Sequence, residues 1–412
     1  MSPAPKQTGL DYSVLKQKAG NKTRKALCSA VVYGPNASGK TNSLGAVDTL
    51  RSIVLRGNIR NADSEYTPNV AAAALEMIPN CDTEASPTEL SIVFVEKGYQ
   101  IEYSLTMELG PFLEKGKRKV ICEKLRVNDK DVFTRGKELE IALPSVIRPL
   151  CNKTINRITQ KLKEIAENSL SETELFLTNG FKSIFAQELV SLITEWFQEK
   201  FIVIYRSDRI KVIHRVSDSK ENTIYVGVTL TKAAKEFGIN SNALGYRNRS
   251  DGEPELCSVF ENRNKVIPAE YFELYGTIRF VNEFPLVMDA LLNGGTLVMD
   301  EFDASIHPMA LMNIISIFHN DEININHAQL IFNSHNPIFL DASLFRRDEI
   351  KFVERDEKTN HSIHYSLSDF KTADGIRKGE DYMNNYFVNR YGAIKEVDFS
   401  QIVRDIVYEN RK

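Results

Sequence analysis

The chain contains 412 residues, 42% of them hydrophobic and 26% charged, and its formal net charge at pH 7 is -3. This length and composition predict a soluble globular protein of two or three domains, and they exclude both a largely disordered chain and one that coats nucleic acid through its overall charge. The five cysteines are scattered without a C-x-x-C pair, and the sequence has neither a signal-peptide core nor a run of about 18 apolar residues. These features predict a cytoplasmic protein without a disulfide framework, a zinc site or a membrane span.

A phosphate-binding loop is the first motif along the chain. Residues 1–25 are polar, and we expect them to form a solvated lead-in. The apolar run Val31 to Tyr33 then leads into GPNASGKT, which matches G-x-x-x-x-G-K-[ST] at every fixed position, and a helix-like pattern follows at 43–55. A glycine-containing turn that matches by chance is the weaker alternative. The residues assigned to nucleotide binding here are Gly34, Pro35, Asn36, Ala37, Ser38, Gly39, Lys40, Thr41 and Asn42.

The residue types in this loop suit a nucleoside triphosphate with Mg²⁺. Backbone N–H groups at a helix N-terminus bind phosphate oxygens, and Gly34 and Gly39 let the chain approach them without a Cβ atom. Lys40 supplies a cation to the β- and γ-phosphates, and the Thr41 hydroxyl reaches the magnesium ion. The sequence therefore predicts that the chain binds a nucleoside triphosphate.

An antiparallel lobe is predicted after the first helix. The strand-like runs 89–96, 99–108 and 119–127 are joined by short turns. The basic turn 115–119 is predicted to be a solvated hairpin tip, with a DNA or phosphate contact as the alternative. We therefore assign 1–144 to the N-terminal half of a nucleotide-binding head.

Helical patterns interrupt the head after residue 144. Apolar residues recur at helical spacing between 145 and 200, short strands are predicted at 201–205 and 222–230, and 240–255 is predicted to be a polar loop. No heptad pattern continues for three or four repeats, which argues against a long coiled coil. These features predict a mainly helical insertion over 145–270.

An acidic pair follows the second predicted strand that carries a motif. Thr296 to Met299 is predicted to be a buried parallel strand, and it leads directly into Asp300 and Glu301. Carboxylates at the carboxyl end of such a strand can hold Mg²⁺ and an attacking water beside a triphosphate. We assign Asp300 to the magnesium ion and Glu301 to the hydrolytic water, and we include Asp303 among the nucleotide-binding residues. The alternative is that these carboxylates cap the next helix, a task that Asp303 and Ser305 can already perform.

A histidine follows the third such strand. Gln329 to Asn333 is predicted to be a buried strand that delivers His335 at its carboxyl end. A histidine is a neutral donor near pH 7, so His335 can contact the γ-phosphate or respond to its loss. A structural role is the alternative for a histidine considered alone. We favour the catalytic role because the other two motifs accompany it.

The remaining residues complete the head. Segments 349–356 and 362–370 are predicted to form an edge hairpin, followed by a helix from Arg377. We assign 271–412 to the C-terminal half of the head. The predicted fold is α/β, a P-loop ATPase head with a mainly parallel core sheet, an antiparallel β-lobe and a helical insertion.

The order of the motifs resembles a known class of ATPases. A phosphate loop, a long insertion, GGTLVMDEFDASIHP and then SHNP are similar to the ATP-binding-cassette heads of SMC and double-strand-break repair ATPases. The tail sequences RRDEIKFVERD, LSDFK and RKGEDYMNNYFVNRYGAI resemble more closely the prokaryotic AbiL-type and OLD-like ATPases. The resemblance spans nearly the whole chain. It implies an ATPase that uses ATP and Mg²⁺, with two heads that sandwich ATP, in an anti-phage defence or abortive-infection system.

Two positions depart from the pattern of these ATPases. The signature segment that a partner head presents resembles S-x-G-T, and here Leu274 stands at the serine position while Gly276 and Thr277 still offer a backbone N–H and a hydroxyl to ATP. By analogy with oxyanion donors, the loss of one donor to developing charge costs on the order of 10²-fold in rate. We therefore predict slow ATP hydrolysis, or the use of ATP mainly as an assembly ligand. Asn336 also replaces the aspartate that is common after the histidine.

Two functions remain open on the sequence. The first is an ATP-gated sensor or scaffold whose paired heads hold or release a separate effector, because the residues after SHNP contain no acidic cluster of the kind that a topoisomerase–primase-type nuclease needs. The expected partners are a second copy or a larger homo-oligomer, an effector nuclease or toxin, and a phage-derived trigger, with no membrane. The alternative is an ATP-dependent DNA-binding or repair protein of the SMC kind, which the near-neutral charge and the missing coiled coil disfavour.

Overall fold

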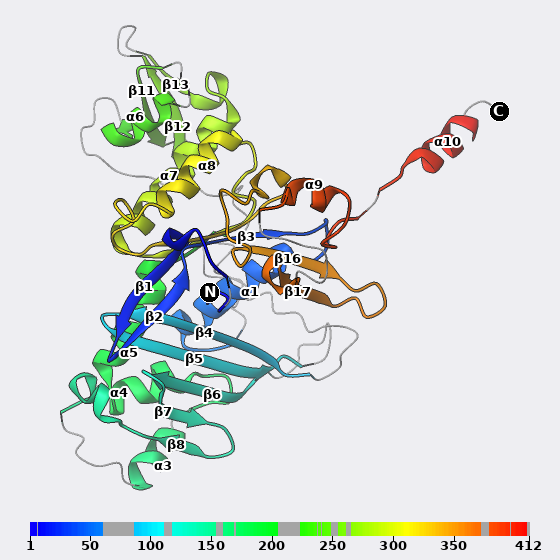
Figure 1. Ribbon diagram of the computed structural model, residues 1–412. Coiled ribbons are helices and arrows are strands. Elements are labelled where there is room, and N and C mark those ends of the chain that lie inside the picture. The colour runs from blue at the N-terminus through cyan, green and yellow to red at the C-terminus, as the bar shows by residue number, and fades with distance from the viewer. Residues whose placement is uncertain are drawn as a thin grey trace.

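Figure 1 shows the computed structural model of the chain. Two predictions lie outside the described residues, namely the part of the basic turn at 115–117 and the start of a helix at Arg377. The structure describes residues 1–5, 7–60, 86–110, 118–153, 160–168, 170–204, 223–236, 238–239, 241–248, 254–260, 265–371, 379–395 and 397–409.

A six-stranded sheet forms the core, and its strand order is β17-β16-β3-β15-β14-β9. All neighbouring strands pair in parallel except β16 and β17, which form an antiparallel hairpin at one edge. The mainly parallel core sheet and the edge hairpin predicted for the tail are therefore confirmed. The strands are β3 (Ser29–Tyr33), β9 (Phe201–Ile204), β14 (Thr296–Met299), β15 (Gln329–Asn333), β16 (Ile350–Arg355) and β17 (Ser362–Ser366).

Apolar side chains cover both faces of this sheet, as parallel strands with nearly continuous hydrophobic sequence require. Leu297 and Met299 of β14 pack into the cluster that includes α7 and α8, whereas Val298 packs into the cluster that includes α1 and the antiparallel lobe. The sheet therefore has a helix-covered face and a face shared with α1 and the lobe. The three helices are α1 (Lys40–Arg56), α7 (Tyr275–Asn293) and α8 (Pro308–Phe318).

The predicted antiparallel lobe is present as a five-stranded sheet in which each strand pairs with the next along the chain. The first three strands match the predicted runs closely. The last two are short additions that the sequence analysis did not identify. The strands are β4 (Thr88–Glu96), β5 (Tyr99–Glu108), β6 (Lys119–Val127), β7 (Lys130–Arg135) and β8 (Leu139–Ile141).

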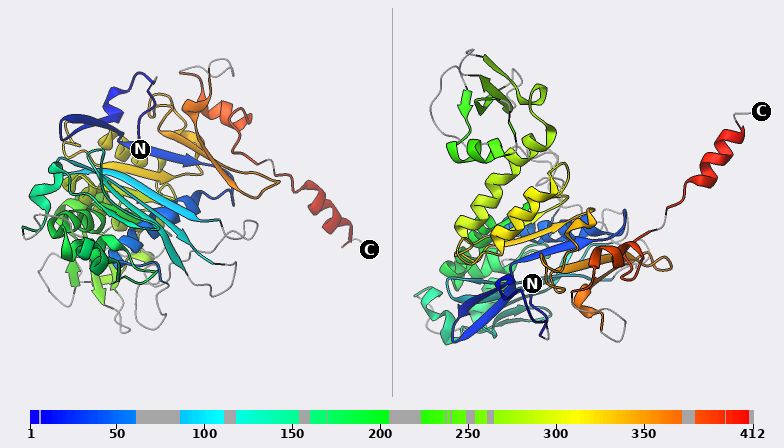
Figure 2. Two further views of the ribbon diagram at one scale, coloured as in Figure 1. Left: turned by 90° about the horizontal axis from the view of Figure 1, so that it is seen from below. Right: turned by 45° about the horizontal axis from the view of Figure 1, so that its top comes forward.

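Residues 145–270 differ from the predicted, mainly helical insertion. Their first part is helical, but β9 belongs to the core sheet, and a separate four-stranded antiparallel sheet lies beyond it. Within the segment 240–255, which was predicted to be a polar loop, the described residues 243–248 and 254–255 belong to strands, and Leu244 and Tyr246 are buried. Figure 2 shows this second sheet standing above α7, away from the core. The elements are α3 (Gln160–Asn168), α4 (Lys182–Ile184), α5 (Gln187–Glu195), β10 (Thr223–Tyr225), α6 (Val228–Glu236), β11 (Ala243–Asn248), β12 (Pro254–Phe260) and β13 (Lys265–Pro268).

The two ends of the chain behave differently. The predicted solvated lead-in is instead a hairpin of β1 (Val14–Ala19) and β2 (Lys22–Leu27), because Leu15 and Leu27 are buried. At the other end, α9 (Tyr382–Phe387) packs on the core, whereas α10 (Ser400–Glu409) projects from the body (Figures 1 and 2).

Among the helices described, none is both long and apolar enough to cross a membrane. The short 3-10 and π segments are η1 (Asp11–Ser13), η2 (Ser145–Leu150), η3 (Leu177–Phe181), η4 (Trp196–Lys200), η7 (Ala269–Tyr271), η8 (Pro337–Phe339) and η9 (Leu367–Asp369).

Candidate nucleotide-binding site

The loop GPNASGKT lies between β3 and α1, so its last residues form the N-terminus of that helix. Gly39 is the residue before α1 and has a φ of 105°, a left-handed conformation that favours glycine. Gly34 lies so close to β16 that an added Cβ atom would be 2.2 Å from the carbonyl oxygen of Val353. Both glycines therefore have a steric reason to be present, and the first turn of α1 directs its N–H groups toward the loop.

Lys40 and Thr41 connect the loop to the acidic strand. The Lys40 ammonium is buried and donates hydrogen bonds to the carbonyl oxygens of Gly34 at 2.6 Å and Pro35 at 3.0 Å. Burial lowers the pKa of Lys40, and the nearby carboxylates of the acidic loop act in the opposite direction. The Thr41 hydroxyl donates to Asp300 Oδ1 at 3.2 Å, although 259 positions separate the two residues. The structure thus brings the first two predicted motifs into direct contact.

Ser38 offers a polar atom that the described residues leave unsatisfied. Its side chain is 1% exposed, and its hydroxyl has no hydrogen-bond partner within the part of the chain that the structure describes. Buried polar groups are normally paired, so this hydroxyl is suited to a ligand oxygen. The backbone carbonyl of Ser38 is held separately by the Ser362 hydroxyl at 2.7 Å.

The two acidic residues that follow β14 lie in different environments. Asp300 is 5% exposed, whereas Glu301 is exposed and has a φ of 50°, an uncommon left-handed conformation for a residue with a side chain. Asn333 at the end of β15 holds both residues, because its amide donates to the Asp300 carboxylate and its side-chain oxygen accepts from the Glu301 backbone N–H. Asn333 was not among the site residues predicted from the sequence. A polar amide that ends an apolar strand beside SHNP was the available signal.

Asp303 stabilises the segment after β15. Its carboxylate accepts hydrogen bonds from the Ser334 hydroxyl at 2.7 Å and from the Asn336 backbone N–H at 3.3 Å. The residue that caps α8 is His307, whose Nδ1 accepts from the Met309 N–H at 3.3 Å. Asp303 therefore joins the acidic loop to the histidine loop and does not cap the helix.

His335 lies at the carboxyl end of β15 and is exposed. Partial burial and the neighbouring Lys40 lower the pKa of His335, although the carboxylates of the acidic loop oppose this shift. The imidazole is therefore neutral at pH 7. Asn336 caps η8, because its side-chain oxygen accepts a hydrogen bond from the Ile338 N–H. His335 is therefore close enough to Lys40 and to the carboxylates of the acidic loop for their charges to affect its pKa.

The predicted signature segment lies at the beginning of α7. Gly276 packs against the acidic loop so closely that an added Cβ atom would be 2.1 Å from the carbonyl oxygen of Ser305. Thr277 is 3% exposed, whereas Leu274 and Tyr275 are 72% and 61% exposed. In the described part of the chain, neither Gly276 nor Thr277 forms a hydrogen bond to the phosphate loop. The surface next to the acidic loop therefore presents the apolar side chain of Leu274 with the phenol ring of Tyr275 beside it.

An arginine on α7 also contacts the acidic loop, and the sequence analysis did not identify it. Arg279 donates to the backbone oxygen of Glu301 at 2.6 Å and to the Glu283 carboxylate at 2.8 Å. Glu283 is 2% exposed, and this burial raises its pKa to about 7 against the opposing effect of Arg279. The spacing of four residues along one helix was the signal available in the sequence.

These residues suit a magnesium–triphosphate complex. The Thr41 hydroxyl and the Asp300 carboxylate provide neighbouring oxygen atoms, which Mg²⁺ prefers as ligands. The unsatisfied Ser38 hydroxyl, the Lys40 ammonium and the N-terminus of α1 provide donors for phosphate oxygens.

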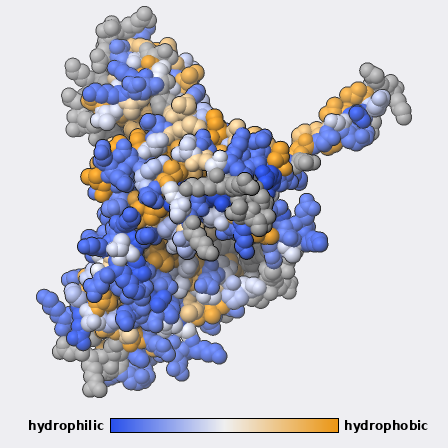
Figure 3. Space-filling model, in the orientation of Figure 1, coloured by the Kyte–Doolittle hydropathy of each residue, from blue (hydrophilic) through white to orange (hydrophobic). Residues whose placement is uncertain are grey.

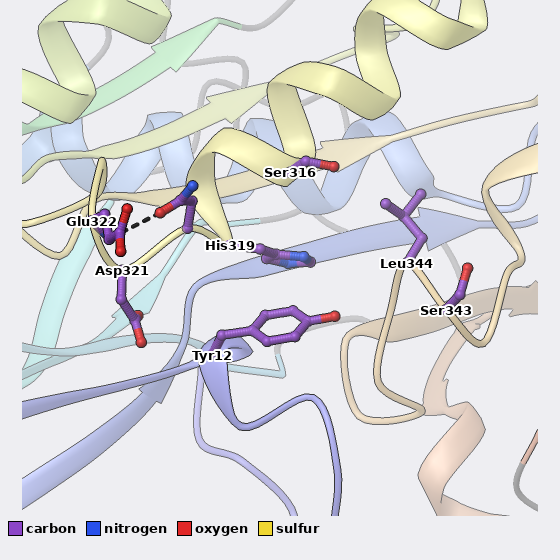
Figure 4. Close-up of a pocket in the computed structure, with 8 residues that line it drawn as sticks. Tyr12, Ser316, His319, Asp321, Glu322, Ser343 and Leu344 are labelled. Carbon is purple, nitrogen blue, oxygen red and sulfur yellow. Dashed lines mark hydrogen bonds between the residues drawn. The ribbon is translucent and has the colours of Figure 1, made fainter.

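A surface pocket elsewhere on the sheet is separate from this site. Figure 4 shows Tyr12 and His319 lining it, and the Ser29 hydroxyl hydrogen-bonds His319 Nε2 at 2.9 Å. Ser29 begins β3, whereas the phosphate loop follows the end of that strand, roughly 15 Å away at the rise of an extended chain. Behind the pocket, the buried side chains of Cys28, His319 and Glu349 lie close together. This cluster is therefore not part of the nucleotide site.

Comparison with known protein families agrees with the site. The family model described as "AAA domain, putative AbiEii toxin, Type IV TA system" matches residues 29–144 and 186–341. The matched segments cover more than half of the chain and include the phosphate loop, the acidic pair and His335. The search of curated proteins gave no match. The chain therefore belongs to this AAA-domain family of P-loop ATPases, whose description names a putative AbiEii toxin and a type IV TA system.

Proposed function

We propose that the chain binds ATP with Mg²⁺, hydrolyses it slowly, and uses ATP-dependent pairing of two heads to hold or release a separate effector in an anti-phage defence system. The observation that carries the first part is the contact between Thr41 of the phosphate loop and Asp300 of the acidic strand. Membership of a P-loop ATPase family supports the same assignment. The head pairing, the effector and the defence role rest on the resemblance to OLD-like and AbiL-type ATPases.

Each site residue has a separate part in the proposed reaction. Lys40 and the N–H groups at the start of α1 bind the phosphate oxygens, and the Ser38 hydroxyl adds a further donor. Thr41 and Asp300 would hold Mg²⁺, which supplies positive charge to the phosphate oxygens when it is bound. Glu301 accepts a proton from the water that forms a bond to the γ-phosphorus, while the bond from that phosphorus to the bridging oxygen breaks. Neutral His335 donates a hydrogen bond to the departing γ-phosphate.

A second head is proposed to complete the pocket. The exposed residues Leu274 and Tyr275 border the acidic loop and are the first that a paired head would meet. Leu274 has no side-chain donor where a serine would have one, and this is the basis of the proposed slow turnover. A turnover of tens per second would rule this part out.

The projecting C-terminal helix supports a separate partner protein. Phe399, Ile402, Val403 and Val407 are exposed on or beside α10, and Figure 3 shows hydrophobic residues along this arm. A helix of this length is marginal in water unless an apolar face packs against something. The family description names a toxin, so a toxic effect of this chain alone is the competing possibility.

The test is affinity purification of the tagged chain from cells that carry the neighbouring genes, in parallel with a chain that ends at Lys395. The proposal expects an effector nuclease or toxin to copurify with the full chain and to be lost with the shortened one. Growth arrest caused by the full chain alone would contradict the scaffold role. Tight, salt-sensitive DNA binding without an effector would instead favour a repair protein of the SMC kind.

A further inference from the structure

The strand order gives a direction to a nucleotide bound at the phosphate loop. Asp300 and His335 follow β14 and β15, which lie on one side of β3, whereas β16 and β17 lie on the other side. The acidic pair places the γ-phosphate end on the β14 side. The ribose and base at the opposite end of the nucleotide are therefore directed toward the hairpin of β16 and β17.

The edge strand β17 packs directly on the loop and on the first turn of α1. The Ser362 hydroxyl donates to the Ser38 carbonyl oxygen at 2.7 Å, and a Cβ atom added to Gly39 would be 2.3 Å from that hydroxyl oxygen. Two residues further along the same face, His364 Nε2 lies 3.3 Å from the Ser43 hydroxyl. This face of β17 therefore forms one wall beside the start of α1.

The chemistry of this wall suits an aromatic base. His364 is exposed beside the hydrogen bond to Ser43, so its ring is accessible. Partial burial lowers the pKa of His364, which keeps the ring neutral near pH 7. The Ser43 hydroxyl engages Nε2 of this ring, which leaves the flat π-face and Nδ1 for a base, and base–aromatic stacking is tolerant of small shifts in position.

We propose that His364, held by Ser43 at the start of α1, forms the recognition site for the purine base of the bound nucleoside triphosphate. Ser43 fixes the ring beside the helix, and the purine stacks on the ring face. Ser362 keeps β17 against the loop and so positions His364. This site rests on the proposed nucleotide binding and adds the residue that distinguishes a nucleotide from a bare triphosphate chain.

The test compares ligands with and without a base. Equilibrium affinities with Mg²⁺ are measured by calorimetry for ATP and for inorganic tripolyphosphate, using the full chain, His364→Ala and His364→Phe. His361→Ala is the matched control, because His361 is an exposed histidine in the turn of the same hairpin. We expect His364→Ala to weaken ATP binding roughly tenfold, the range of a lost stacking partner. Tripolyphosphate binding should stay unchanged, and His364→Phe and His361→Ala should retain ATP affinity.

The outcomes separate this inference from the proposed function. If the unmodified chain binds neither ligand, the proposed function fails. If it binds both ligands equally well, no base is recognised and only the base site fails. An equal loss of both ligands in His364→Ala would show that His364 acts through the loop, and unchanged ATP affinity would show that it does not act at all. Either result overturns the base site.

Discussion

Replacing Asn333 by alanine is expected to slow ATP hydrolysis more than it weakens ATP binding. Asn333 is 1% exposed and connects the Asp300 carboxylate to the backbone N–H of Glu301. A hydrogen bond to a charged group contributes about 1.5–3 kcal/mol, and each ~1.4 kcal/mol changes a rate tenfold. If the whole loss falls on the transition state, kcat decreases roughly 10- to 150-fold. The contacts of Lys40 within the loop do not involve Asn333, so ATP affinity should change little.

Asn324 provides the matched control for this variant. It is 4% exposed, and its side chain bonds to the backbone of Phe318 and Ala328, away from the nucleotide site. Asn324→Ala should lower the thermal unfolding temperature about as much as Asn333→Ala, because both remove buried hydrogen bonds. Steady-state phosphate release should separate the two variants. Equal kcat values in the two variants, or a kcat of Asn333→Ala within about twofold of the unmodified chain, would refute the role given to Asn333.

Two further substitutions test the site and its support. Glu301→Gln should bind ATP but release little phosphate, and light scattering should then detect an ATP-dependent dimer; ATP-bound monomers at micromolar concentration would contradict the proposed head pairing. Glu283 has a pKa raised to about 7 in the folded chain, so the native state binds its proton more tightly than the unfolded chain. Its contribution to stability is therefore complete below the ordinary pKa of 4.5 and is lost as pH rises from there through about 7, with about 1.4 kcal/mol of the loss between pH 6 and pH 8. Denaturant unfolding of Glu283→Gln should lack this loss, and identical pH slopes in both proteins would contradict the assignment.

The sequence predicted the parts of the fold in which local pattern and tertiary position agree. The apolar strands β14 and β15 end in polar residues, and because parallel strands share their carboxyl edge, the meeting of Asp300 and His335 at one edge was predictable. The second sheet was not predicted, because Leu244 is flanked by Ala243 and Gly245 instead of polar residues, so the sequence shows no clear apolar–polar alternation there.

The supporting residues of the site left only weak signals in the sequence. Asn333, Arg279 and His364 act through contacts with segments far away in the chain. None of them belongs to a motif with fixed spacing. Their roles depend on how α7 and β17 pack against the loops, which the strand and helix periods do not determine.

The most direct measurement of the central claim is the effect of Mg²⁺ on ATP affinity in the unmodified chain and in Asp300→Asn. If the phosphate loop and the acidic strand form one magnesium–nucleotide site, Mg²⁺ tightens ATP binding to the unmodified chain. This enhancement should be largely lost in Asp300→Asn, while binding of metal-free ATP persists through Lys40 and the loop. The same enhancement by Mg²⁺ in both proteins would contradict the claim that Thr41 and Asp300 hold the metal together.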